Sequence, residues 1–191
     1  MVLGITGSIG SGKSTAADIL TKEYGFIPIG TDELAKQIMN ENNQCRRLLK
    51  DAFGPEIYGP DEKIDKENYK KTIFCSDRNR NISDSIVHPL VWEAVKEIID
   101  GGPEKDYLVE TAVPGDSFCD ICDRILLVTA DKDTRVKRLM KNRGYSREYA
   151  ESVISGQKSE KELESMADIV IDNSGGTEEL RENIRKAVEA L

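Results

Sequence analysis

The clearest pattern in the chain is the alternation of short apolar runs with segments of helical periodicity. Five runs read as strands: VLGIT (2–6), FIPIG (26–30), DYLVE (106–110), RILLVTA (124–130) and DIVID (168–172). Runs this apolar are typical of central parallel strands, because both faces of such strands are covered. Helical segments between the strands then predict an α/β fold, in which a mostly parallel five-stranded sheet lies between two layers of helices.

The helical segments are expected at 14–25, 31–39, 66–74, 87–100, 132–144, 145–167 and 176–191. Thr31 and Thr177 are suited to the N-caps of their helices, and Pro89 to the first turn of 87–100. In 132–144, Met140 shares the apolar spacing of Val136 and is expected to point inward.

Two stretches interrupt the alternation of strand and helix. The first, about 31–100, is helical, and the second, about 141–165, is basic and polar. The chain shows no internal repeat and no linker. We therefore expect one domain spanning 1–191 with two insertions.

The segment between the first strand and the first helix carries the chemistry. GSIGSGKS, from Gly7 to Ser14, fits G-x-x-x-x-G-K-[ST] and has the strand–loop–helix context that a phosphate-binding P-loop needs. Glycines allow a tight turn with inward N–H groups, and the helix that follows adds its unpaired N–H groups and its positive dipole end. Lys13 is expected at the β and γ phosphates of ATP, and the Ser14 hydroxyl at Mg²⁺. The loop residues expected to contact the nucleotide are Gly7, Ser8, Gly10, Ser11, Gly12, Lys13, Ser14 and Thr15.

The loop alone does not say which P-loop protein this is. No N-K-x-D segment that would read guanine is present, so a GTPase is a weak interpretation. Asp32 follows the second strand, where small-molecule kinases place a carboxylate facing the phosphates. The alternative is that Asp32 only stabilises the first turn of a helix through the dipole.

The net charge and the lengths of the apolar runs indicate which kinds of partner the protein can bind. The net charge is −8, which argues against sequence-independent binding of nucleic acid but not against an anionic small molecule in a locally positive pocket. No apolar run approaches 18 residues and no secretory signal precedes the first strand, so we expect a cytoplasmic protein without a membrane partner.

Four cysteines are present: Cys45, Cys75, Cys119 and Cys122. The last two form a CDIC segment, but a zinc site would want two more soft ligands and His88 is the only histidine. We expect reduced thiols rather than a metal or redox pair.

Taken with their order, several segments resemble the dephospho-CoA kinase family over nearly the whole chain. GITGSIGSGKST looks like the P-loop of that family, and TDELAKQI like its helix start with a catalytic aspartate, here Asp32. IVHPLVW carries its His-Pro, RLMKNRGYSREYAESVISGQ looks like its lid, and ADIVIDNSGG is similar to its closing signature. The first of these segments is generic, whereas VHPLVW and ADIVIDNSG are specific.

The resemblance implies a P-loop kinase core with a helical CoA-binding insertion and a mobile helical lid. The implied reaction is phosphorylation of the 3′-hydroxyl of dephospho-CoA by ATP. It implies that Asn173 lies by the adenine and that His88 contacts the acceptor or its scaffold. Arg138 and Arg143 are the candidates for stabilising the transferring phosphoryl group; their alternative role is a solvated basic helix face. We expect a monomer or a weak homo-oligomer.

The chain departs from the family pattern at Gly30, Asn142, Val153 and Asp116. Gly30 stands where the family usually has a second Asp, and Asn142 and Val153 where lid arginines are common. Asp116 stands roughly where the family has Glu. Two rival functions follow: a P-loop kinase of a nucleoside, nucleotide or other small molecule, and an ATP-binding regulatory module without turnover.

Overall fold

The five expected strands pair in a single parallel sheet of the computed structural model, which describes residues 1–191. The strands are β1 (Val2–Thr6), β2 (Ile27–Gly30), β3 (Tyr107–Glu110), β4 (Arg124–Thr129) and β5 (Ile169–Asp172), in the order β2-β3-β1-β4-β5. The first strand is therefore central, and its carboxyl end leads into the glycine-rich loop. The predicted α/β fold with a five-stranded parallel sheet is confirmed.

The chain divides into two compact units. The first combines Met1–Gly30 with Gly102–Leu191 and contains the whole sheet. The second, Thr31–Gly101, is helical. None of the helices combines the length and the apolar character needed to cross a membrane.

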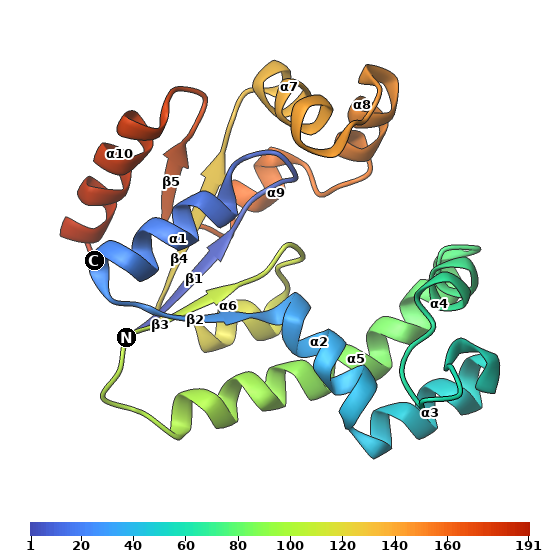
Figure 1. Ribbon diagram of the computed structural model, residues 1–191. Coiled ribbons are helices and arrows are strands. Elements are labelled where there is room, and N and C mark those ends of the chain that lie inside the picture. The colour runs from blue at the N-terminus through green and yellow to red at the C-terminus, as the bar shows by residue number, and fades with distance from the viewer. The chain divides into compact units, whose positions relative to one another are not determined.

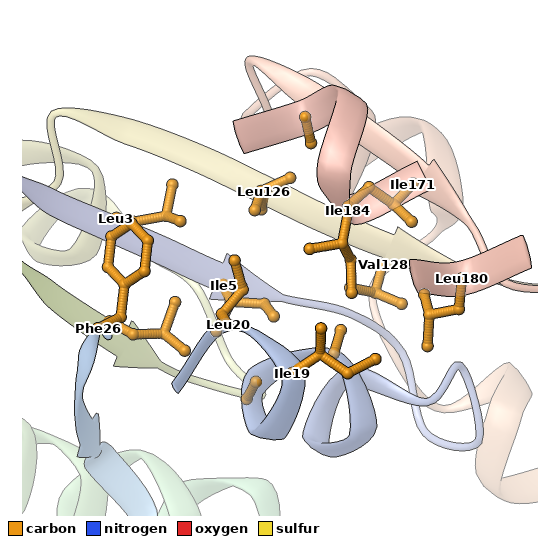
Figure 2. Packing of buried hydrophobic residues seen from close by; sticks show 14 residues of the cluster. Leu3, Ile5, Ile19, Leu20, Phe26, Leu126, Val128, Ile171, Leu180 and Ile184 are labelled. Carbon is orange, nitrogen blue, oxygen red and sulfur yellow. The ribbon is translucent and has the colours of Figure 1, made fainter. Parts of the chain in front are cut away.

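One face of the sheet is covered by α1 (Lys13–Tyr24) and α10 (Thr177–Glu189), as Figure 1 shows. Leu3 and Ile5 of β1 point to this side because alternate residues of a strand share a face. They pack with Leu20 of α1 and Ile184 of α10 in one buried apolar cluster (Figure 2). This cluster anchors the strand and the helix that flank the glycine-rich loop.

The opposite face is covered by α6 (Asp116–Ile121) and α9 (Glu160–Glu164). Gly4 of β1 leaves room for α6: a Cβ there would lie 2.6 Å from Cζ of the fully buried Phe118. Leu163 of α9 is 4% exposed. The periodicity did not predict α6, because a helix of six residues is too short to show a repeating pattern.

The helices α7 (Lys132–Arg143) and α8 (Arg147–Ser155) pack on each other through a small cluster of Val136, Leu139 and Ala150. The prediction that Met140 points inward is wrong, since its side chain is 40% exposed. The reason is that α8 covers only the side of α7 that carries Val136 and Leu139.

The second unit consists of α2 (Thr31–Glu41), α3 (Asn43–Phe53), the short 3₁₀ helix η1 (Pro55–Ile57), α4 (Lys66–Ile73) and α5 (Asp77–Asp100). The expected helix 87–100 begins ten residues earlier, because the Ser76 side chain caps it by accepting from the Asn79 N–H. Pro89 therefore lies inside α5 rather than in its first turn. The N-cap expected at Thr177 also shifts by one residue, to Gly176.

Candidate functional site

The glycine-rich loop turns the chain from β1 into α1 through two left-handed glycines. Gly10 has φ 81° and Gly12 has φ 93°, a region that residues with a Cβ avoid. Gly12 is the N-cap of α1 and has no side chain to cap the first turn. The N–H groups that begin α1 are therefore available to an anion, together with the positive end of the helix dipole.

The carbonyl groups of this loop are held from the side by two residues far away in sequence. Arg138 donates through Nη1 to the carbonyls of Gly10 (3.3 Å) and Ser11 (3.1 Å), and Asn173 donates through Nδ2 to Ser11 O at 2.6 Å. Arg138 also donates from Nη2 to the Asn173 carbonyl at 2.8 Å, so the two residues that hold the loop are bonded to each other. Because C=O and N–H point in opposite directions across a planar trans peptide, fixing the Ser11 carbonyl also fixes the N–H of Gly12.

Lys13 and Ser14 face a carboxylate that the sequence analysis did not single out. Glu110 is the last residue of β3 and pairs in register with Ile5 of β1. Its Oε1 lies 2.9 Å from Lys13 Nζ, and it accepts a 3.3 Å hydrogen bond from Ser14 Oγ. The Lys13 and Glu110 side chains are 13% and 28% exposed. The available signal was the place of Glu110 at the carboxyl end of the third strand, the edge at which ligands bind in open α/β sheets.

The oxygen donors at this point fit a magnesium ion. Mg²⁺ prefers oxygen ligands and is held in P-loop proteins by the loop Ser or Thr and a strand-end carboxylate. The Ser14 hydroxyl and the Glu110 carboxylate are such a pair, and they already touch. No nitrogen or sulfur ligand is required.

The remaining loop residues differ in exposure. Ser11 is fully buried, and its hydroxyl has no hydrogen-bond partner, like that of the neighbouring Thr6. Ser8 is 9% exposed, whereas Thr15 is exposed in the first turn of α1. These two buried hydroxyls lie at the end of β1 and in the loop whose Gly10 and Ser11 carbonyls are held by Arg138.

Within the first unit, the structure joins several of the predicted site residues by hydrogen bonds. The loop, Arg138 and Asn173 are joined in the first unit by the hydrogen bonds given above. Arg143 ends α7 and is exposed, with its guanidinium on the surface. Asp32 and His88 belong to the second unit.

Asp32 is exposed in the first turn of α2 and comes two residues after the end of β2. His88 lies in the middle of α5, and its Nε2 is 3.6 Å from Oδ1 of Asp84, one turn earlier. Both side chains of that pair are about half exposed. His88 therefore lies well inside a helix and not at its start.

The thiols of α6 are poor nucleophiles. Burial raises the pKa of the Cys122 thiol to about 12, and it also raises the pKa of Cys119. A raised pKa leaves little thiolate at neutral pH, and the thiolate is the reactive form. Cys122 acts in packing, since its Sγ lies against Gly4 of β1.

Comparison with known proteins relates the whole chain to one family. Residues 1–179 match the family described as dephospho-CoA kinase. A protein of that name from Fusobacterium nucleatum is 30% identical over 100% of this chain and 98% of its own length. Another, from Oceanobacillus iheyensis, is 34% identical over 95% of this chain and 92% of its own.

Solved structures share the fold. A Thermus thermophilus protein, 29% identical, superposes with a TM-score of 0.78 over 100% of this chain and 96% of its own. Dephospho-CoA kinase from Campylobacter jejuni is 23% identical and superposes with a TM-score of 0.73 over 98% of this chain and 95% of its own. Shikimate kinase from Bacteroides thetaiotaomicron is 12% identical and superposes with a TM-score of 0.58 over 100% of this chain and 97% of its own. The fold is therefore that of the P-loop kinases.

Proposed function

The chain belongs to the dephospho-CoA kinase family, and on that premise we propose that it transfers the terminal phosphoryl group of ATP to the 3′-hydroxyl of dephospho-CoA, giving CoA and ADP. The observation that carries the proposal is the loop from Gly7 to Ser14. Its carbonyls are held outward by Arg138 and Asn173, and Lys13 stands at the start of the helix. A loop held in this way directs its N–H groups to one side, where the phosphates of a nucleotide can accept from them.

Phosphoryl transfer depends on positioning and on neutralising charge more than on covalent chemistry by the protein. The N–H groups at the start of α1 and the Lys13 ammonium bind the β and γ phosphates. In the unliganded chain Lys13 pairs with Glu110, so ATP takes the lysine from that carboxylate. Ser14 and Glu110 are the residues that would hold Mg²⁺, and the ion would supply neutralisation of the phosphate charge.

The two arginines take different roles. Arg138 already donates three hydrogen bonds to loop and strand-end carbonyls, so its role is to hold the loop. Arg143 is exposed at the last turn of α7 and is the arginine free to reach the transferring phosphoryl group. Asn173 contributes to the nucleotide site through the loop, because its side-chain amide is engaged with Ser11.

The second unit, Thr31–Gly101, supplies the residues that act on the acceptor. Asp32 is exposed and follows β2 directly, which suits a base that takes the proton of the acceptor hydroxyl. His88 contributes to binding of dephospho-CoA, and its half-exposed ring lies 3.6 Å through Nε2 from Oδ1 of Asp84. A carboxylate such as Asp32 would repel a triphosphate, so its presence favours catalysis over simple nucleotide binding.

Closure over ATP is assigned to the segment 141–165. Within it, α9 is packed on the sheet through the buried Leu163, whereas the residues that start and end α8 are exposed or half-buried. The moving part is therefore α8 with its flanking residues, and α9 is its fixed base. Closure would exclude water, which otherwise competes with the acceptor for the phosphoryl group.

The test is release of ADP by the purified chain with ATP, Mg²⁺ and one acceptor at a time. Dephospho-CoA should stimulate ADP release, and the product should carry the new phosphate at the 3′ position by phosphorus NMR. Adenosine, AMP and shikimate should give the rate without acceptor. Equal stimulation by a nucleotide would assign the chain to another acceptor, and no stimulation by any acceptor would make it a binding module. Lys13→Ala is the control for ADP release by a contaminating kinase.

A further inference from the structure

Ile9, at the tip of the glycine-rich loop, is held on three sides by the segment from α7 to α9. Its N–H donates to Oε1 of Gln157 at 2.8 Å. Its carbonyl accepts from Nε of Arg135 at 3.1 Å. Its side chain packs against the cluster of Val136, Leu139 and Ala150. No residue of the motif other than Ile9 is joined to the rest of the chain through both backbone groups and a side chain.

The next residue confirms how close this approach is. A Cβ on Gly10 would lie 3.0 Å from the carbonyl oxygen of Arg135 and 3.2 Å from its Cα. The tip of the loop therefore rests on the backbone of α7 at Arg135. A shift of that helix would be transmitted to the loop by direct contact.

Arg135 is built into this place rather than reaching out from a surface. It is 3% exposed, and its Nη1 pairs at 3.0 Å with Oε1 of Glu160, the first residue of α9. A buried guanidinium needs its hydrogen bonds satisfied, and here one partner is the loop and the other is α9. The same side chain thus fixes the loop relative to the base of the segment that closes.

The orientation of the peptide groups gives these contacts a consequence for phosphate binding. Because Arg135 holds the Ile9 carbonyl outward, the N–H of Gly10 must point the other way. If that peptide rotated, a carbonyl oxygen would face the phosphates in place of a donor. Glycine permits such a rotation at Gly10 at little steric penalty, so the side chains that hold Ile9 are what prevent it.

We propose that Gln157 and Arg135 are positioning residues, which set the conformation of the phosphate-binding loop through the two backbone groups of Ile9. The proposal rests on the proposed function only in taking the loop's ligand to be ATP. Gln157 lies between α8 and α9, so movement of α8 changes the loop through Gln157 while Arg135 stays fixed. ATP binding and closure are therefore coupled through Ile9.

The test compares two substitutions of Gln157 with one of its neighbour. Gln157→Met keeps the size and removes the acceptor, whereas Gln157→Glu keeps an acceptor for the Ile9 N–H. Lys158→Met is the matched control, since Lys158 donates a 2.9 Å hydrogen bond from the same segment, but to Pro114 O rather than to the loop. Calorimetry with ATP alone gives the affinity, and steady-state kinetics give the KM for each substrate.

Gln157→Met should bind ATP about five- to tenfold more weakly, the equivalent of one hydrogen bond, with the KM for the acceptor unchanged. Gln157→Glu should recover most of the affinity, and Lys158→Met should match the parent. A purely structural role of Gln157 would lower the unfolding temperature without changing ATP affinity, and that result would overturn the proposal. Equal weakening in Lys158→Met would overturn it as well.

Arg135→Lys provides an independent arm, because lysine keeps the charge but cannot serve Ile9 and Glu160 together. ATP affinity should fall in this variant, whereas Glu160→Gln, which keeps a hydrogen-bond acceptor for Arg135, should fall less. Unchanged affinity in a folded Arg135→Lys protein would remove Arg135 from the proposal. Calorimetry needs no acceptor, so these results stand even if dephospho-CoA proves to be the wrong acceptor.

Discussion

Glu110 offers the sharpest test of the site, because its removal should change ATP binding and catalysis in opposite directions. In the unliganded chain its carboxylate competes with ATP for Lys13, at 2.9 Å. In the proposed function, the same carboxylate would help Ser14 to hold Mg²⁺ once ATP is bound. Glu110→Gln keeps the size of the side chain and removes the charge, so it separates these two roles.

The size of each effect follows from the burial of the pair. Exposed ion pairs contribute about 0.2–1 kcal/mol, and hydrogen bonds to charged groups about 1.5–3 kcal/mol. Lys13 is 13% exposed and Glu110 28%, so the pair lies between these cases, near 1 kcal/mol by these general values. Without Mg²⁺, the variant should therefore bind ATP about fivefold more tightly. Turnover at saturating ATP should fall by about 10–100-fold, the usual effect of losing a group that orders a metal site.

The measurement is a pair of titrations by calorimetry, one with EDTA and one with Mg²⁺, together with kcat as a function of Mg²⁺ concentration. Asp116→Asn is the matched control, since it removes one exposed negative charge from the helix that follows the same strand. If ATP binding in EDTA is unchanged or weaker in Glu110→Gln, Lys13 is not restrained by Glu110. If the Mg²⁺ dependence of kcat is also unchanged, the carboxylate has no part in the site.

Four further variants test the other roles. Lys13→Ala should fold normally and lose about 10²–10³-fold in kcat, and normal turnover in a folded protein would remove it from the phosphate site. Asp32→Asn should bind ATP as well as the parent while kcat falls by about 10²–10⁴-fold; a matching loss of affinity would make Asp32 structural. Replacing Cys119 and Cys122 by serine should leave kcat unchanged, and stoichiometric zinc in the parent protein would contradict this. Asp131→Ala should lower the unfolding temperature by a few degrees at pH 7, because Asp131 caps α7 and the hydrogen bond from Thr134 holds its pKa below the usual range. A group whose pKa is lowered in the folded state stabilises at higher pH, so the difference between parent and variant should be full above about pH 4, shrink as the pH falls below it, and vanish only below the lowered pKa of the folded state.

The strands and the P-loop could be predicted because their signals are local. A run such as RILLVTA is apolar enough that both of its faces must be covered, which predicts a central strand. In G-x-x-x-x-G-K-S, all the residues that form the loop lie within eight positions. Where prediction failed, a local signal was either weak or overlooked. Pro89 suggested a helix start, but Ser76 caps the same helix earlier and Pro89 lies inside it. A proline inside a helix removes one backbone hydrogen bond and crowds the carbonyl four residues before it, so the helix start was the more favourable place to expect it.

The residues around the loop could not be predicted in the same way, because their roles depend on partners far along the chain. Ser11 and Asn173 are 162 positions apart, and Ile9 and Gln157 are 148 apart. From sequence, Arg138 was a basic residue that could face phosphate or solvent. The structure engages its guanidinium with three carbonyls, which is a third possibility that no local pattern expresses.

This long-range support links nucleotide binding to the stability of the first unit. The glycines of the loop lose the most freedom on folding. They keep one conformation only while Arg138 holds the Gly10 carbonyl and while Arg135 and Gln157 hold the two backbone groups of the adjacent Ile9. A peptide carrying the motif alone would have none of these partners, so its donors would not converge. In the folded chain, ATP binds the assembled loop and not the unfolded one, and mass action then stabilises every segment that holds it. Substitutions at Arg135, Arg138 or Asn173 should therefore reduce the stabilisation that ATP gives, in addition to any loss in the unliganded protein.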